Sequence, residues 1–243
     1  MITIIITAVL LIYIIAKRAE LAAAWGRVRF QRGDTDKALK IFERADKLGT
    51  LKADNLMFYG YILLRTGHLA EARTVLTRAS MSAAKPALKK RIKTMLALVE
   101  WKEGNLNQAI EDLEEVIEDF KSTAVYQDLG LLYVISGNRE RALEFNLEAY
   151  DYNADDMVIA DNLAEAYALC GEDEKAAEIY EALLEKKPHF PEAYYGYGRL
   201  LIKRGERARG IELIRESLDK RFSYLSVMSK AEVEEMLSEL ENE

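Results

Sequence analysis

The sequence predicts an all-α solenoid built from about six stacked helical hairpins, and three observations support this fold class. Glycines recur every 33 to 37 residues, at Gly33, Gly67, Gly104, Gly137, Gly171 and Gly205. An alanine lies five residues after each of the first five glycines, at Ala38, Ala72, Ala109, Ala142 and Ala176. The chain has only three prolines and is rich in residues that favour helix. A period close to 34 residues is typical of helical-hairpin repeats.

The first element expected is a transmembrane anchor helix over residues 1–16. The run from Ile2 to Ala16 carries no charge and is followed at once by Lys17 and Arg18. A helix of this length covers about 22 Å, less than the ~30 Å of a hydrocarbon core. Snorkelling of the two cations and local thinning of the bilayer would make up the difference. The alternative is a buried core segment.

The charges around this run predict its orientation. A secretory signal would carry its positive charges before the apolar stretch, whereas here they follow it. The positive-inside rule then predicts a single-pass membrane protein with its N-terminus outside and its repeats in the cytoplasm. Because no Gly or Pro interrupts residues 2–25, the anchor is expected to continue without a break into the first repeat helix, ending near Arg32.

The body of the chain is expected to form a solenoid over residues 17–224. Glycines at the hairpin turns supply the left-handed conformation that other residues resist. Small residues let the two helices of a hairpin approach closely, while aromatic side chains fill the volume between hairpins. Repeats are expected near 19–52, 53–86, 90–122, 123–156, 157–190 and 191–224.

Several positions recur in phase within these repeats. The fourth repeat has Tyr126, Leu129, Gly130, Tyr133, Ala142 and Ala149. The fifth has Leu163, Ala164, Tyr167, Ala176, Tyr180 and Pro188. This pattern resembles the tetratricopeptide repeat (TPR) family over about residues 19–222, and the resemblance implies a right-handed superhelix that serves as a binding scaffold. The sixth repeat departs from the pattern, since Gly210 and Ser217 replace its two alanines.

A capping helix is expected at the C-terminus, over residues 225–243. Ser229 and Glu232 have the spacing of a capping box. The apolar residues that follow fall on one helical face: Val233, Met236, Leu237 and Leu240. A partner-binding tail is the alternative interpretation of this segment.

Composition and motifs argue against several function classes. The net charge is −7, with a basic excess in residues 1–100 and an acidic excess in the remainder. The basic half favours contact with anionic lipid, unless its charges are simply solvated outer faces. No phosphate loop, dinucleotide fingerprint or metal-ligand cluster occurs. We therefore expect no enzymatic activity, no catalytic residue, no cofactor, no bound metal and no nucleic-acid partner.

The resemblance implies a concave groove lined by the first helix of each repeat, which would bind a protein or peptide partner. The groove residues expected are Met57, Tyr61, Leu64, Arg65, Leu98, Trp101, Lys102, Gln127, Glu165, Tyr195 and Arg199. Leu131, Val134, Asp161 and Lys203 occupy further groove positions. Tyr61, Leu64, Leu98 and Trp101 would form an apolar strip there, or would instead pack against neighbouring helices.

One TPR subclass grips a C-terminal carboxylate with Lys, Asn and Arg side chains on successive repeats. Asn162 matches one such position, but Gln127 and Leu131 precede it where Lys and Asn are expected. Glu192 and Gly196 replace the expected cations in the next repeat. A chaperone tail is therefore not the expected partner, and Asn162 is interpreted as structural.

Two functions remain open from the sequence. The first is a membrane-anchored scaffold or adaptor that binds its partner in the concave groove. The second is a structural assembly factor of a membrane protein complex that acts through its anchor and convex faces. The sequence predicts neither the identity of the partner nor the oligomeric state.

Overall fold

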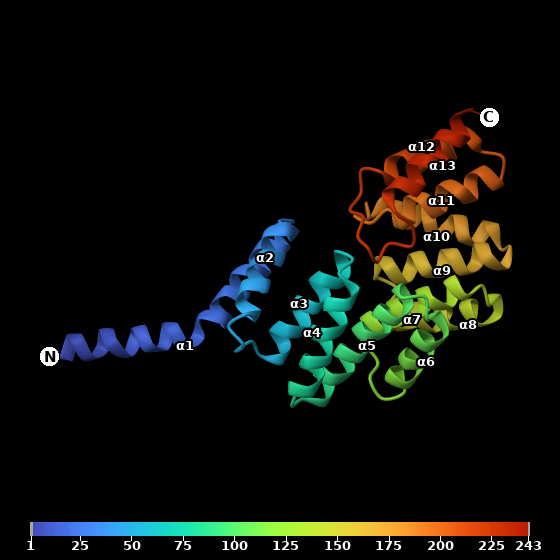
Figure 1. Cartoon of the computed structure of the whole chain (residues 1–243). Helices are drawn as coiled ribbons and strands as arrows, with labels where there is room; N and C mark the ends of the chain where they lie inside the picture. Colours follow the sequence, from blue (N-terminus) through green and yellow to red (C-terminus); the bar gives the residue numbers. More distant parts are fainter. Residues whose placement is uncertain (1, 243) are drawn as a thin grey trace. The chain divides into compact units, whose positions relative to one another are not determined.

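The structure, a computed structural model, is all-helical, with thirteen α-helices and no strands over the part of the chain that it describes. It describes the backbone of residues 2–242 and the side chains of residues 17–242. Two compact units divide the chain, one ending at Val99 and the other beginning at Glu100. Each is described by itself below (Figure 1).

The first unit contains α1 (Ile2–Gln31), α2 (Thr35–Asp46), α3 (Ala53–Arg65), α4 (Leu69–Ser82) and most of α5 (Pro86–Lys102). Here α1 pairs with α2, α3 pairs with α4, and α2 packs on α3. Pro86 opens α5, as expected for a residue whose missing N–H costs nothing in a first helical turn. The small residues also act as predicted: a Cβ on Gly60 of α3 would lie 2.5 Å from the Leu76 side chain of α4.

The second unit contains the end of α5 and the remaining helices. These are α6 (Leu106–Ile117), α7 (Thr123–Ser136), α8 (Arg139–Tyr152), α9 (Met157–Cys170), α10 (Asp173–Glu185), α11 (Glu192–Lys203), α12 (Arg207–Ser217) and α13 (Lys230–Asn242). Hairpins form between α7 and α8, α9 and α10, and α11 and α12, and α7 and α11 each also pack on α9. The sequence thus predicted a hairpin solenoid correctly, while the boundaries between repeats stay a prediction.

The turn glycines adopt the left-handed backbone conformation that the sequence predicts for them. All six recurrent glycines have positive φ, from 72° at Gly137 to 95° at Gly104. In this left-handed region a Cβ would crowd the backbone, so only glycine enters it at little cost. Each hairpin can therefore reverse direction within two or three residues.

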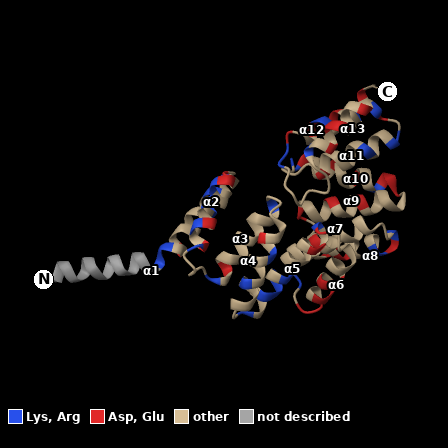
Figure 2. Ribbon diagram, viewed as in Figure 1, with Lys and Arg blue, Asp and Glu red and all other residues tan. Residues whose placement is uncertain are grey.

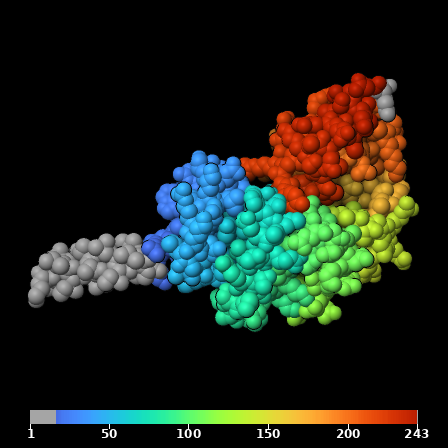
Figure 3. Space-filling model, viewed as in Figure 1, coloured from blue at the N-terminus to red at the C-terminus, as the bar shows by residue number. Residues whose placement is uncertain are grey.

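α13 covers the end of the second unit, beside α11 and α12 (Figure 3). Its capping box is formed: the Ser229 backbone N–H donates to Glu232 at 2.7 Å, and the Glu232 N–H donates to the Ser229 hydroxyl at 3.2 Å. Val233 and Leu237 are buried in a cluster with Tyr195 and Ile214. The amphipathic face predicted from the sequence is therefore the face that packs.

The expected membrane topology is corrected. The anchor predicted at residues 1–16 lies outside the residues whose side chains are described. Among the residues that are described, we find no helix with both the length and the apolar character needed to cross a membrane. The uncharged run stops at Lys17 and Arg18, short of the roughly 20 apolar residues that a spanning helix requires. The prediction of a single-pass membrane protein is therefore wrong.

Candidate functional site

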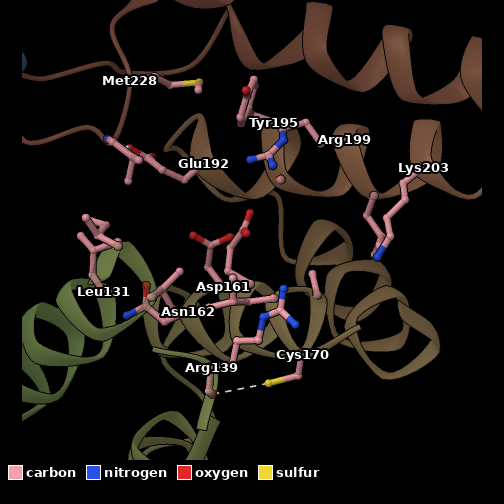
Figure 4. A pocket seen from close by; sticks show the side chains of 18 of the residues that line it. Leu131, Arg139, Asp161, Asn162, Cys170, Glu192, Tyr195, Arg199, Lys203 and Met228 are labelled. Atoms are coloured by element: carbon pink, nitrogen blue, oxygen red, sulfur yellow. Dashed lines mark hydrogen bonds between the residues drawn. The ribbon is translucent and has the colours of Figure 1, made fainter. Parts of the chain in front are cut away.

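A pocket of about 610 Å³ opens in the second unit, between the first helices of three successive hairpins. α7 supplies an apolar side formed by Leu131, Val134 and Ile135. α9 and α11 supply most of the polar groups, among them Asp161, Glu165, Glu192, Arg199 and Lys203. Val227 and Met228, from the loop before α13, complete the lining, and Figure 4 shows Met228 on the α11 side of the pocket. The pocket thus combines an apolar wall with charged groups, as sites that bind side chains commonly do.

Asp161 is the most unusual group of this lining. Its side chain projects from α9 into the space between α9 and α11, with Glu192 and Tyr195 on the opposite side (Figure 4). Asp161 is only 5% exposed, and its buried Oδ1 accepts no hydrogen bond from the residues that the structure describes. Burial raises the pKa of Asp161 well above its usual range, and the nearby Glu165 and Glu192 raise it further.

Glu165 lies one helical turn after Asp161 and is held in place by α10. The Tyr180 hydroxyl donates to Glu165 Oε1 at 2.8 Å. A Cβ on Gly196 of α11 would lie 2.3 Å from the same carboxylate oxygen and 2.4 Å from the tyrosine hydroxyl. Because position 196 is a glycine, Glu165 and Tyr180 can pack directly against the backbone of α11.

The loop between α12 and α13, residues 218–229, reaches the end of α5 inside the second unit. Lys102 Nζ donates to the Ser226 carbonyl at 2.9 Å and lies 4.0 Å from the centre of the Trp101 ring. The Val227 N–H donates to Glu192 Oε1 at 3.4 Å. Because the loop contacts both α5 and α11, we call residues 218–229 the closing loop.

Seven of the predicted groove residues line this pocket: Leu131, Val134, Asp161, Glu165, Tyr195, Arg199 and Lys203. The Arg199 guanidinium carbon lies 5.5 Å from the centre of the Tyr195 ring. The Tyr195 hydroxyl donates to the Met236 sulfur at 3.2 Å, so this side chain links the pocket to α13. Burial raises the pKa of the Tyr195 hydroxyl.

Other predicted groove residues of the second unit make contacts within the chain. Gln127 Nε2 donates to Asp156 Oδ1 at 2.8 Å, at the N-cap of α9. The Gln127 carbonyl accepts from Asn162 Nδ2 at 2.8 Å, which agrees with the structural interpretation of Asn162. Trp101 and Lys102 lie beside the closing loop rather than in the pocket, and burial lowers the pKa of Lys102.

In the first unit, most of the expected apolar strip is interior. Leu64 is 0% exposed, and Met57 and Leu98 are also buried, because these positions face neighbouring helices. Of the two alternatives that the sequence left open for Leu64 and Leu98, their burial favours packing against neighbouring helices over an open groove. Tyr61 is half-buried: its ring packs edge-on against Phe30 at 5.9 Å, and its hydroxyl accepts from Arg65 at 3.1 Å.

The sequence did not predict the part played by the closing loop. Its contacts join positions more than 30 residues apart, such as Glu192 and Val227, so no local sequence pattern predicts them. Sequence spacing did place Asp161 in the groove, but not its burial or its missing partner. No group of three or more potential metal ligands gathers within the described residues.

Three family models match the chain, each described as tetratricopeptide repeat, over residues 29–96, 91–118 and 158–200. The chain contains tetratricopeptide repeats. Among curated proteins, the TPR repeat-containing protein YvcD of Bacillus subtilis is 29% identical over 113 residues, which make up 46% of this chain. The match spans 23% of the length of that relative.

Several solved structures share the fold. A TPR protein of Parabacteroides merdae superposes with a TM-score of 0.74 at 15% identity, over 93% of this chain and 85% of the other. A TPR protein of Thermus thermophilus gives 0.66 at 18% identity, over 79% and 100% of the two chains. PilF of Pseudomonas aeruginosa gives 0.61 at 17% identity, over 92% and 99%. At these identities the likeness establishes the fold alone.

Proposed function

We propose that this chain is a TPR scaffold that binds a segment of a partner protein in the pocket of its second unit. The observation that carries the proposal is the pocket itself, because the first helices of three successive hairpins line it together. The apolar side chains of α7 would hold apolar side chains of the partner, and the charged groups of α9 and α11 would fix its register.

The volume of the pocket supports this proposal. At about 610 Å³ it is large enough for a few side chains of a peptide and falls within the usual range of ligand pockets, roughly 300–1,000 Å³. The lining polar groups come from α-helices that pack on one another, so the site is largely preformed. A preformed site loses little conformational entropy when it binds.

A peptide-display selection on the immobilised full chain tests this function. Peptides that enrich are then titrated against the wild type and against Leu131→Glu, which places a charge on the apolar wall. The matched control is Leu147→Glu, since Leu147 lies on α8, is 41% exposed and is not part of the pocket lining. We expect Leu131→Glu to weaken binding by about tenfold or more, and the control to change it by less than about twofold.

A second pocket variant and a check of folding complete this test. Val227→Glu alters the pocket from the closing loop, where the side chain is 48% exposed and can change without unfolding the unit. Circular dichroism melts establish that each variant is folded. If no peptide enriches, or if both leucine variants lose binding equally, the pocket is not the binding site.

A second candidate function rests on α1. Leu21, Trp25 and Val28 are 49%, 60% and 37% exposed and lie on one face of that helix. An exposed apolar stripe of this kind favours association with another protein, and would suit a structural role within an assembly. In that case, Trp25→Ser would abolish the association, while Leu131→Glu would leave it unchanged.

A further inference from the structure

Three carboxylates line the pocket of the second unit, Asp161 and Glu165 from α9 and Glu192 from the first turn of α11. The charges of Glu165 and Glu192 both act on Asp161. We call these three side chains the acidic corner. Glu165 accepts from the Tyr180 hydroxyl and Glu192 accepts from the Val227 N–H, both of which are neutral donors.

Asp161 is the unsatisfied member of the acidic corner. Asp161 is about nineteen-twentieths buried, with an exposed fraction of 5%. Its Oδ1 has no hydrogen-bond donor among the described residues. A buried polar atom without a partner is destabilising, so it is rarely kept where nothing uses it. Asp161 also lines the pocket, so a ligand that enters the pocket lies next to its carboxyl group.

The cations around the pocket are directed elsewhere. Lys203 Nζ pairs with Asp173 Oδ1 at 2.7 Å, and Lys102 Nζ donates to the Ser226 carbonyl at 2.9 Å. The Arg199 guanidinium lies over the Tyr195 ring. Arg139 lines the pocket at the start of α8, where its carbonyl accepts from Cys170. Within the described residues no ion pair joins these cations to the acidic corner, and Glu192 acts on Lys102 only through its charge.

We propose that the acidic corner binds the lysine or arginine side chain of the partner segment, with Asp161 and Glu165 accepting its N–H donors. This inference rests on the proposed function, because it names the chemistry of the segment that the pocket holds. A neutral donor would satisfy Oδ1 but would do nothing to offset the repulsion that Glu165 and Glu192 exert on an ionised Asp161. A cation both satisfies the oxygen and offsets the repulsion, and it does so at short range in a partly dehydrated site.

Charge over the rest of the unit agrees with a cationic partner. Residues 101–243 carry about twice as many acidic as basic side chains. Figure 2 marks acidic residues in red along the ribbon of the second unit, between α6 and α13. Such a field attracts a basic segment over distances of about a Debye length and repels an acidic one.

Binding of this kind is coupled to protonation. The buried Asp161, facing Glu165 on its own helix and Glu192 on α11, has a raised pKa. The other titratable groups around these carboxylates are Arg199, Tyr195 and Tyr180, together with Lys102, on which the charge of Glu192 acts. A cation binds the ionised carboxylate, so the complex releases a proton and tightens as the pH rises above the ordinary aspartate range, about pH 4.

The experiment uses random peptides displayed against the immobilised full chain. We expect the enriched peptides to share a Lys or Arg at one fixed position. Synthetic copies with norleucine in place of that cation should bind the wild type about tenfold or more weakly. Calorimetry at one pH in two buffers of different ionisation heat should show a proton released with the cationic peptide and none with the norleucine peptide.

Variants assign the effect to the acidic corner. Asp161→Asn keeps the shape of the side chain, and the tenfold preference for the cation should fall to less than about threefold. Asp151→Asn, an exposed aspartate of α8 outside the pocket, should keep the full preference. Should Asp161→Asn melt at a much lower temperature, Glu165→Gln serves as the second variant, with the same expected loss.

The possible outcomes distinguish a failure of the proposed function from a failure of the acidic-corner proposal. Peptides that depend on Leu131 but share no cation, or that lose less than about twofold with norleucine, overturn the acidic corner and leave the proposed function standing. Enrichment of acidic or purely apolar peptides overturns it in the same way. If no peptide enriches, the proposed function fails and the acidic corner fails with it.

Discussion

At the scale of single residues, Gly210 shows why one repeat departs from the pattern of the others. A Cβ on Gly210 of α12 would lie 2.5 Å from the Gly198 carbonyl oxygen, and a Cβ on Gly198 of α11 would lie 2.7 Å from the Gly210 carbonyl oxygen. The two helices therefore meet backbone to backbone. Alanine, which the other hairpins carry at this position, has no room here.

This contact predicts whether Gly210→Ala raises or lowers the stability of the protein. Replacing a helical glycine by alanine usually stabilises a protein by roughly 0.5–1 kcal/mol. For Gly210→Ala we expect the opposite, a loss of about 1–3 kcal/mol, because backbone atoms cannot move aside as a flexible side chain can. Urea denaturation of the two proteins measures the difference, and a more stable variant would show that α11 and α12 are not in this close contact.

The sequence predicted which residues lie at groove positions, but not which of them are buried. The repeat phase placed Glu165, Tyr195 and Arg199 in the groove, because position within a repeat decides which way a side chain points. The burial of Leu64 and Leu98 did not follow from phase alone, since adjacent groove positions differ in how closely the next helix approaches.

At the scale of elements, α13 ties the closing loop to the pocket. Its capping box fixes where the helix starts, and its buried face packs against Ile214 and against Tyr195, which lines the pocket. Ser229→Ala should therefore lower stability by about 0.5–2 kcal/mol and speed amide exchange at the start of α13. Ser238→Ala, at an exposed position of the same helix, is the control.

The interpretation of α13 depends on that comparison. Equal stability of Ser229→Ala and Ser238→Ala would mean that the capping box contributes nothing and that the helix is held by its apolar face alone. A faster exchange confined to α13 would place the effect in this element. Faster exchange in α11 as well would show that the cap also supports the pocket through Tyr195.

Helices and turns were predictable for a physical reason. Glycines at a fixed interval, small residues within hairpins and a capping box are local signals, and each acts within a few residues of the chain. The closing loop joins residues far apart in sequence, as Lys102 and Ser226 do, so it depends on tertiary packing. The prediction of a single-pass membrane protein relied on the apolar composition of residues 2–16 and gave too little weight to the length of the run, which is below the roughly 20 residues of a spanning helix.

At the scale of the molecule, the two units differ in character. The first is rich in basic residues and exposes the apolar stripe of α1, while the second is acidic and holds the pocket. If the pocket is the working surface, then the second unit recognises the partner and the first unit has a separate role. The two candidate functions therefore assign the partner to different units, which makes them separable by experiment.

Hydrogen exchange of the full chain, with and without a display-selected peptide, tests the central claim most directly. The account predicts slower exchange in α7, α9, α11 and the closing loop, with α1 to α4 unchanged, because groups covered by a ligand open less often. Slower exchange centred on α1, with the pocket helices unaffected, would contradict the claim and favour association through the exposed stripe of α1.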